Sequence, residues 1–459
     1  MAAAPVLQHF ERPFPVSVRG LVIDGFGDVV RGAAVNILFG GNAIGRAQAG
    51  EDGGFLMSDL QLKAGLHTIR AFTPGYNTTD ENFNVTESMA DSTLMFLLRL
   101  NHAGWGDPAR DISQRPLIIP ERVAERRSRE QKYAAVDVFF ATDRKFENVR
   151  NIYQRFGAIR SADGTISFGF CRISIPEGHR LGHLETPIFK LKIIEDPGRH
   201  VVVLDMNILP ENEFFQAVQT SIRSSETNDL FVFVHGYHVT FPEAVRRTAQ
   251  LAFDLNFKGA PICYSWPSAG EFSKYPADEA SVEWSTEHFV TFLTRLVRNG
   301  VARTIHVIAH SMGSRLVANA LRMIADGASP LGDHKVGQVV FAAPDIDSGL
   351  FAQITRKAFS PGERTSLYAS SNDLALGISQ QFHTYPRAGN SEPNITIFTG
   401  VDTIDASQVP IGFIGHSYYG TRTALTDIYE LINHGTPPPR FGLKQLSNES
   451  GQIYWLIHP

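Results

Sequence analysis

The sequence predicts a small all-β sandwich domain followed by an α/β domain, in which a mostly parallel sheet carries helices on both faces. Two patterns and the chain length support this prediction. Residues 15–100 hold short alternating β runs separated by Gly and Asp turns, which is typical of a sandwich. From Val136 onward, apolar strands alternate with helical patterns, as in parallel sheets. With 459 residues and 43% hydrophobic composition, the chain is long enough for two or three domains with buried cores.

Changes in composition along the chain indicate the domain boundaries. We expect the sandwich at residues 1–100, a linker at residues 101–132 and the α/β domain at residues 133–459. The linker is polar, contains prolines and interleaves Arg with Glu. Because acids alternate with bases there, the sequence favours an exposed connector over a nucleic-acid-binding patch.

The α/β domain is expected to open with four β-rich segments, after which strands and helices alternate. One helix start is well marked, because Thr240, Pro242 and Glu243 form a capping box with proline in the first turn. In such sheets the active site lies at the carboxyl ends of the strands. The expected elements are strands at 136–141, 166–175, 187–195, 200–209 and 230–234, a helix at 241–257, a strand at 262–266, a helix at 281–298, and strands at 304–310, 336–342, 365–369 and 395–399.

The most informative motif lies where the strand at 304–310 ends. The chain reads Ala309-His310-Ser311-Met312-Gly313, and apolar residues then recur at helical spacing. A serine on a strained strand-to-helix turn needs small residues two positions away on each side, so that strand and helix pack closely. Ala309 and Gly313 are those residues, with alanine in place of the usual first glycine. The motif predicts a nucleophile elbow with Ser311 as nucleophile, and with it an α/β-hydrolase fold.

A serine hydroxyl needs a base to accept its proton and an acid to orient that base. On this fold the acid and then the histidine follow the serine in the sequence. Asp373 directly follows the predicted strand 365–369 and is the expected acid, while Asp345, after the preceding strand, is the alternative. His416 lies in a loop between the last predicted strand and a helix beginning near Arg422, and it is the expected base.

Two backbone amides are expected to stabilise the oxyanion, since amides fixed by the fold need no reorganisation during the reaction. One belongs to Met312, directly after the nucleophile, and the other to Tyr237, in a His-Gly-Tyr loop after the strand at 230–234. Trp266 ends another strand at the same edge. It is a candidate substrate-pocket residue, with an apolar core or rim position as the alternative.

Composition argues against several other functions. A net charge of −5 with mixed signs gives no basic surface for nucleic acid or anionic lipid, and no long apolar run predicts a membrane span. The first fourteen residues do not resemble a signal peptide, so we expect a cytoplasmic protein, with a secreted mature form as the alternative. Cys171 and Cys263 lie far apart in apolar runs and are expected as buried free thiols. No phosphate loop or metal-ligand spacing occurs, so no cofactor and no metal are expected.

Many segments in order resemble one bacterial α/β-hydrolase family of the esterase/lipase superfamily, long catalogued as a domain of unknown function. The resemblance covers roughly residues 136–435 and implies a serine carboxylesterase-like catalytic domain. The segments that carry it are Phe139 to Arg144, Ile173 to Pro176, His235-Gly236-Tyr237, Phe241 to Phe257, Ser265 to Ser268, Asp278-Glu279-Ala280, Ile308 to Arg315, Ala342 to Asp347, Tyr368 to Asp373 and His416 to Tyr419.

The N-terminal region resembles the carboxypeptidase-regulatory-like domain. The resemblance rests on runs such as Val18 to Val22, Gly32 to Val35 and Glu51 to Phe55. It implies a transthyretin-like sandwich that is usually a non-catalytic appendage. We assign it no chemistry, and it is a candidate surface for homo-oligomer formation.

The expected function is hydrolysis of a small-molecule or polymeric carboxylic ester through an acyl-enzyme on Ser311, His416 and Asp373. An acyltransferase or amidase on the same triad is the first alternative, and a non-catalytic binding or scaffold protein is the second. Residues 268–285 are a candidate mobile cap, because Gly270, Pro276 and acidic and aromatic side chains follow the catalytic edge.

Overall fold

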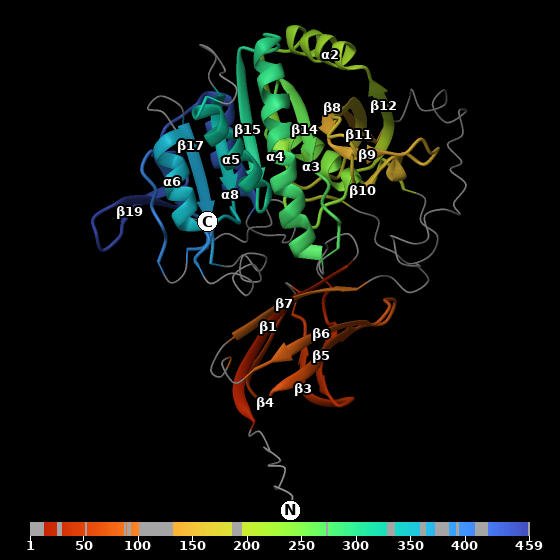
Figure 1. Ribbon diagram of the computed structural model, residues 1–459, viewed down its shortest axis with the longest axis vertical. Coiled ribbons are helices and arrows are strands. Elements are labelled where there is room, and N and C mark those ends of the chain that lie inside the picture. Colours follow the sequence, from red (N-terminus) through yellow and green to blue (C-terminus); the bar gives the residue numbers. More distant parts are fainter. Residues whose placement is uncertain are drawn as a thin grey trace, which may run out of the picture. The chain divides into compact units, whose positions relative to one another are not determined.

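The chain divides into two compact units, Met1–Ser113 and Gln114–Pro459, which are described here one at a time (Figure 1). The division falls inside the segment expected as a linker. The computed structural model describes residues 13–24, 30–50, 53–86, 89, 93–100, 132–185, 195–271, 274–327, 336–358, 364–371, 385–391, 394–408 and 421–457.

The N-terminal unit is an all-β sandwich of two sheets, as predicted. One sheet has the order β4-β1-β7 and the other β3-β2-β5-β6, and their inner faces form a single core. Alternate residues of β5 point inward, so that His67, Ile69 and Ala71 are buried. The strands are β1 (Phe14–Asp24), β2 (Ala34–Phe39), β3 (Asn42–Gln48), β4 (Gly54–Leu62), β5 (Gly65–Phe72), β6 (Thr79–Val85) and β7 (Thr93–Leu100).

The second unit is built on a mixed sheet of eleven strands, in the order β12-β11-β8-β14-β13-β15-β16-β17-β18-β20-β19. From β8 to β20 every neighbouring pair is parallel, and both ends of the sheet are antiparallel. The strands are β8 (Tyr133–Thr142), β11 (Ser167–Pro176), β12 (Val203–Leu209), β13 (Asp229–Val234), β14 (Ala260–Ser265), β15 (Thr304–His310), β16 (Val336–Ala342), β17 (Arg364–Ala369), β18 (Val401–Asp405), β19 (Leu443–Ser447) and β20 (Ile453–Ile457).

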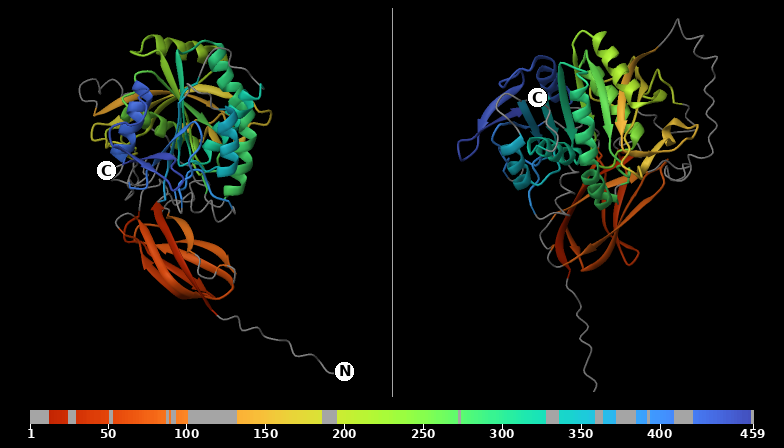
Figure 2. Two further views of the ribbon diagram at one scale, coloured as in Figure 1. Left: turned by 90° about the vertical axis from the view of Figure 1, so that its left-hand side faces the viewer. Right: turned by 45° about the horizontal axis from the view of Figure 1, so that its top comes forward.

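Helices cover both faces of this sheet, as the left view of Figure 2 shows. On one face α2 (Glu211–Arg223), α4 (Tyr275–Arg298), α5 (Gly313–Ala325) and α6 (Ser348–Ala358) share a core. On the other face lie α3 (Phe241–Asp254) and α8 (Thr421–His434). The central strand β13 is sandwiched between the layers, so Leu230 to Val234 are wholly buried. Among the described helices, none is both long and apolar enough to cross a membrane.

The strand predicted at residues 395–399 is wrong. Residues 395–398 are irregular, and the strand that pairs with β17 is β18, which begins at Val401. Two aspartates make β18 locally unlike a buried strand, but Asp402 accepts a hydrogen bond from Arg364 of β17 (Nη1–Oδ2 2.5 Å). The polar residue is therefore stabilised by a partner that local sequence patterns do not show.

Other predicted elements are confirmed, with shifted ends. Helix α4 begins at Tyr275, six residues before the predicted start at residue 281. The helices α2 and α6 and the hairpin β19–β20 were not predicted. Residues 187–194 of the predicted strand 187–195 lie outside the described residues. Cys171 and Cys263 are buried free thiols, as expected.

Candidate active site

Ser311 sits in a strained turn between β15 and α5. Its backbone φ is +48°, a left-handed value that serine seldom adopts and that surrounding structure must enforce. The Ser311 amide donates to the carbonyl of Ala342 at the end of β16 (3.0 Å), and the residue is only 6% exposed. The predicted nucleophile thus has the backbone geometry expected of a nucleophile elbow.

Two glycines allow the turn to pack against the loop after β13. A Cβ atom added to Gly313 would lie 2.2 Å from the carbonyl oxygen of His235, and one added to Gly236 would lie 2.9 Å from the Cβ of Ser311. Neither contact is sterically allowed, so both positions need glycine. Strands β13 and β15 are paired in parallel, with Val234 opposite Ala309. The loop carrying Tyr237 and the elbow carrying Met312 therefore leave neighbouring strands at the same edge.

Met312 and Tyr237 stay the predicted oxyanion donors, since the structure contains no substrate. Met312 is the N-cap residue of α5, and among the described residues its amide donates to no backbone carbonyl. The Tyr237 ring packs edge-on against Tyr275 (centroids 5.1 Å apart).

Asp373 and His416 lie outside the described residues, so their places in a triad stay predictions. Before Asp373 the described residues end at Ser371, just past β17, where the amide of Ser370 donates to the carbonyl of Gly389 (2.8 Å). Before His416 they end at Gln408, just past β18, where the amide of Ala406 donates to the carbonyl of Ala369 (2.8 Å). Both of these positions lie at the carboxyl edge that holds Ser311.

Residues 211–434 match the family described as "Alpha/beta hydrolase of unknown function (DUF900)". This part of the chain has the alpha/beta-hydrolase fold, after which we name the second unit, Gln114–Pro459, the hydrolase domain. No curated protein is significantly similar in sequence to the chain.

Three solved structures illustrate the structural similarities. The Bacillus anthracis TIE protein has 9% identity, covering 29% of this chain and 18% of its own, with a TM-score of 0.16. Hydroxyquinol 1,2-dioxygenase from Pseudomonas putida DLL-E4 has 14% identity, and the match covers 20% of this chain and 57% of the dioxygenase, with a TM-score of 0.15. A hyperthermophilic esterase from the archaeon Pyrobaculum calidifontis has 16% identity, and the match covers 46% of this chain and 78% of the esterase, with a TM-score of 0.29. These TM-scores are too low to carry an argument about this chain.

In the hydrolase domain Asp345, the alternative acid, belongs to an ion cluster beside the elbow. Its carboxylate accepts a hydrogen bond from the hydroxyl of Tyr275 (2.6 Å) and faces Nε of Arg387 (3.2 Å) and Nη2 of Arg315 (3.4 Å). Asp345 is 2% exposed, so these groups neutralise a charge that water does not reach. Asp345 thus has a structural task, and it stays the alternative acid.

Trp266 lies in the core of the hydrolase domain, beneath the loop after β13. It is fully buried, its indole N–H donates to the carbonyl of His235 (2.8 Å), and its ring stacks on the His235 ring (centroids 5.1 Å apart). These contacts favour the core interpretation. Direct contact with a substrate stays a prediction, and complete burial disfavours it.

The candidate cap, residues 268–285, is tied to the same edge. Most of its described part is the start of α4, whose Tyr275 bonds to Asp345 and to Nη2 of Arg315 (2.8 Å). Asp278, one turn later, accepts hydrogen bonds from Ser268 and Ala269. These contacts favour a fixed wall over a mobile cap.

Arg144 and Asp278 had no predicted role, although both are buried beside the site (1% exposed each). Burial lowers the pKa of Arg144 to about 10, so it stays charged at neutral pH. Burial also raises the pKa of Asp278. Both residues lie in segments that carry the family resemblance, but the partners of Arg144 lie up to 124 residues away, so no local pattern predicts its contacts.

His235, which begins the loop after β13, is neutral at pH 7. Burial, together with the charge of Arg144, lowers its pKa to about 3. Its Nδ1 lies 2.8 Å from the carbonyl of Gly236, and its Nε2 lies 3.1 Å from the Ser265 hydroxyl, which accepts from Nε of Arg144 (3.0 Å). This network assigns the proton to Nδ1, with Ser265 donating to Nε2.

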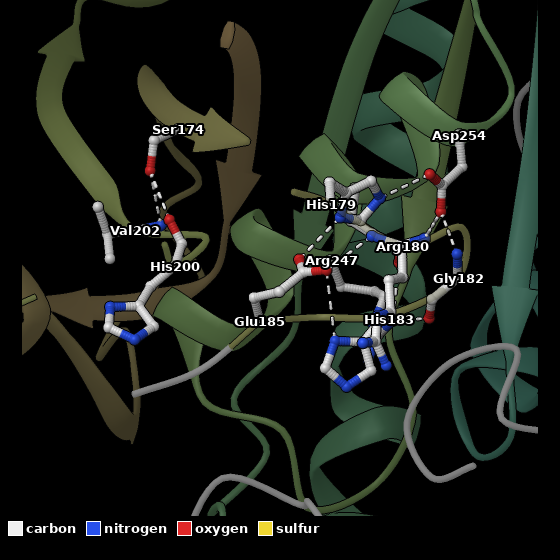
Figure 3. Close-up of polar contacts among 11 residues, drawn as sticks. Ser174, His179, Arg180, Gly182, His183, Glu185, His200, Val202, Arg247 and Asp254 are labelled. Atoms are coloured by element: carbon white, nitrogen blue, oxygen red, sulfur yellow. Dashed lines mark hydrogen bonds and ion pairs between the residues drawn. The ribbon is translucent and has the colours of Figure 1, made fainter. Parts of the chain in front are cut away.

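A second buried charge cluster in the hydrolase domain joins the loop after β11 to the end of α3 (Figure 3). His179 lies between Glu185 and Asp254, with both nitrogen–oxygen distances at 2.7 Å. Burial lowers the pKa of His179, but the bonds to Asp254 and Glu185 outweigh it and raise the pKa to about 9. No group of described residues has the ligands to hold a metal ion.

Proposed function

We propose that the protein is a serine hydrolase that cleaves carboxylic esters through an acyl-enzyme on Ser311. The observation that carries this proposal is the left-handed backbone of Ser311, +48° in φ, at the carboxyl end of a central parallel strand. Such strain on a serine points its hydroxyl out of the turn, where a substrate and a base can reach it.

In the proposed reaction, Ser311 Oγ attacks the ester carbonyl while His416 accepts the hydroxyl proton. Asp373 orients His416 and stabilises its positive charge. The negative oxygen of the tetrahedral intermediate accepts hydrogen bonds from the Met312 and Tyr237 amides. Collapse breaks the bond to the alcohol, which leaves with the proton from His416, and water then releases the acid by the same steps in reverse order.

Two observations support ester hydrolysis without fixing the substrate. Ser311 is buried at the end of β15, and Tyr237, whose amide is a predicted oxyanion donor, packs its ring edge-on against Tyr275. Serine, base and backbone donors are sufficient for acyl transfer to water. The acyl chain and the alcohol, whether of a small or a polymeric ester, are left to experiment.

The deciding experiment is hydrolysis of p-nitrophenyl esters from acetate to palmitate by the full chain, with Ser311→Ala in parallel. We expect hydrolysis by the wild type, a preferred chain length and no activity in the variant. Labelling with a fluorophosphonate probe tests the nucleophile separately. Wild-type protein that neither hydrolyses nor labels would favour the scaffold alternative, while product transfer to an added alcohol or amine would favour an acyltransferase or amidase.

A further inference from the structure

We propose that buried Arg144 and Asp278 are positioning residues that together hold the loop after β13 in the shape that aims the Tyr237 amide at the oxyanion. This inference rests on the proposed function. Neither residue is expected to touch the substrate. Each is expected to act through the backbone of residues 235–240, which we call the oxyanion loop.

Arg144 begins the short strand β9 (Arg144–Phe146) and reaches from there under two loops of the site. Its Nη2 donates to the carbonyl of Val239 in the oxyanion loop (2.9 Å). Its Nε and Nη1 donate to Ser265 Oγ (3.0 Å) and to the carbonyl of Ser268 (3.0 Å) after β14. A fourth bond, from Nη1 to the carbonyl of Gly157 (2.8 Å), anchors the guanidinium.

Asp278 contacts the same two loops from α4. Its Oδ2 accepts from the Ser268 hydroxyl (2.6 Å) and from the amide of His238 in the oxyanion loop (3.3 Å). Its Oδ1 accepts from the amide of Ala269 (2.7 Å). In the oxyanion loop, Arg144 therefore binds the carbonyl of Val239 and Asp278 binds the amide of His238. In the loop after β14, Arg144 binds Ser268, and Asp278 binds Ser268 and Ala269.

The two residues after Tyr237 are consequently fixed on several sides. Val239 accepts from Arg144 through its carbonyl and donates to Ser268 Oγ through its amide (3.1 Å). His238 has a φ of +63°, a costly value for histidine that needs support from outside the loop. The bond from its amide to Asp278 supplies that support. The direction of the Tyr237 peptide is set by these neighbours, because it is joined to them covalently.

Arginine is suited to this position for a geometric reason. One planar guanidinium donates to four acceptors on three separate segments, and a lysine ammonium with three donors on a flexible stem cannot match that arrangement. Burying the charge is tolerable because four of the five guanidinium N–H groups have acceptors and Asp278 supplies a nearby negative charge. A neutral side chain at either position would leave several buried backbone groups without partners.

The kinetic consequence concerns the transition state. Oxyanion donors act on charge that develops only as the bond forms, and losing one typically lowers kcat by about 10²–10³-fold. Misdirecting the Tyr237 amide in Arg144→Gln or Asp278→Asn is therefore expected to lower kcat at least about tenfold with little change in KM. Arg144→Lys is expected to restore only part of this loss.

The test measures the loop itself as well as the rate, using the full chain. Hydrogen–deuterium exchange of peptides covering residues 235–240 is compared for wild type, Arg144→Gln, Arg144→Lys and Asp278→Asn. The control is Arg440→Gln, because Arg440 is also buried (4% exposed) and bonds to Asp427 (2.6 and 2.9 Å) elsewhere in the hydrolase domain. Thermal unfolding temperatures are measured for all five proteins.

We expect faster exchange at residues 235–240 in the Arg144 and Asp278 variants, and wild-type exchange there in Arg440→Gln at a similar loss of unfolding temperature. Wild-type exchange of the oxyanion loop in Arg144→Gln and Asp278→Asn would overturn the inference, as would an equal increase in the control. If the wild type neither hydrolyses esters nor labels with fluorophosphonate, the proposed function fails, while the exchange data still decide whether the two residues hold the loop.

Discussion

The amide nitrogen of Asp345 lies 3.2 Å from the carbonyl oxygen of Ser311, so the loop after β16 is hydrogen-bonded to the elbow itself. The same residue binds two arginines and a tyrosine through its side chain. Asp345 is therefore close enough to Ser311, the proposed nucleophile, to matter for activity either as the acid or as a structural anchor.

The two candidate acids are expected to differ when each is changed to asparagine. Asp373→Asn should lower kcat by about 10⁴-fold, because the base loses its orienting charge, and should leave the unfolding free energy nearly unchanged. Asp345→Asn should cost about 3–5 kcal/mol of unfolding free energy, because it leaves the buried Arg387 beside a neutral amide.

Ester hydrolysis and urea unfolding of both variants check this. A 10⁴-fold loss of kcat in Asp345→Asn, together with near-normal activity in Asp373→Asn, would exchange the two assignments.

Replacing Gly313 by alanine is expected to destabilise the hydrolase domain. The new Cβ would lie 2.2 Å from the carbonyl of His235, so elbow and oxyanion loop must separate, at a cost of about 1–3 kcal/mol or more. Gly178→Ala is the control, because a Cβ there meets nothing within 4 Å. The unfolding temperature and the rate of p-nitrophenyl acetate hydrolysis should both fall for Gly313→Ala and stay at the wild-type values for Gly178→Ala. Wild-type values of both quantities in Gly313→Ala would contradict this packing.

The bridge from Glu185 through His179 to Asp254 predicts how stability depends on pH. The pKa of His179 is about 9 in the folded protein against 6.5 as its ordinary value, so its stabilisation is complete below pH 6.5 and lost as pH rises through 9. Burial raises the pKa of Glu185, but its bonds to His179 and His183 outweigh this and lower it from 4.5 to about 2. Its contribution is therefore present above pH 4.5 and lost as pH falls through 2.

Urea unfolding of wild type and His179→Gln between pH 3 and 10 measures this contribution. The difference in unfolding free energy should be largest between about pH 4.5 and 6.5 and should shrink steadily toward pH 9. A difference that stays constant across this range would show that the charge on His179 contributes nothing.

Trp266→Phe separates the two interpretations of that residue. Phenylalanine keeps most of the buried area but loses the bond to the His235 carbonyl, so we expect a cost of about 1–3 kcal/mol for the unpaired carbonyl and an unchanged KM. Equilibrium unfolding and ester kinetics on short and long acyl chains provide the measurement. A raised KM at unchanged stability would instead place the indole in the substrate pocket.

The elbow could be predicted because its requirements are local. An apolar strand, a serine between two small residues and a helical repeat lie within about twenty consecutive residues, and the strain at Ser311 follows from them. The strand β18 could not be predicted in the same way, because Asp402 is stabilised by Arg364, 38 residues earlier. The apolar residues near Ile395 gave the stronger local signal and led to the wrong segment.

The roles of Arg144 and Asp278 also depend on distant partners. Arg144 meets Ser265, Ser268 and Val239 only after the sheet has brought β8, β13 and β14 together. No residue spacing in the sequence predicts these contacts of Arg144. Buried charges of this kind are found from the fold, whereas the candidate nucleophile Ser311 is predicted from the motif.

The two cysteines have a practical consequence, because their reactivity can be used to follow unfolding of the hydrolase domain. Both thiols of the chain lie in that domain, fully buried, and burial raises the pKa of Cys263 to about 12 and that of Cys171 well above its usual value. Thiolate is the reactive form, so the folded domain should be inert to a thiol reagent. The rate of colour development with such a reagent therefore measures the opening of the hydrolase domain alone. The sandwich has no cysteine and does not contribute to the signal.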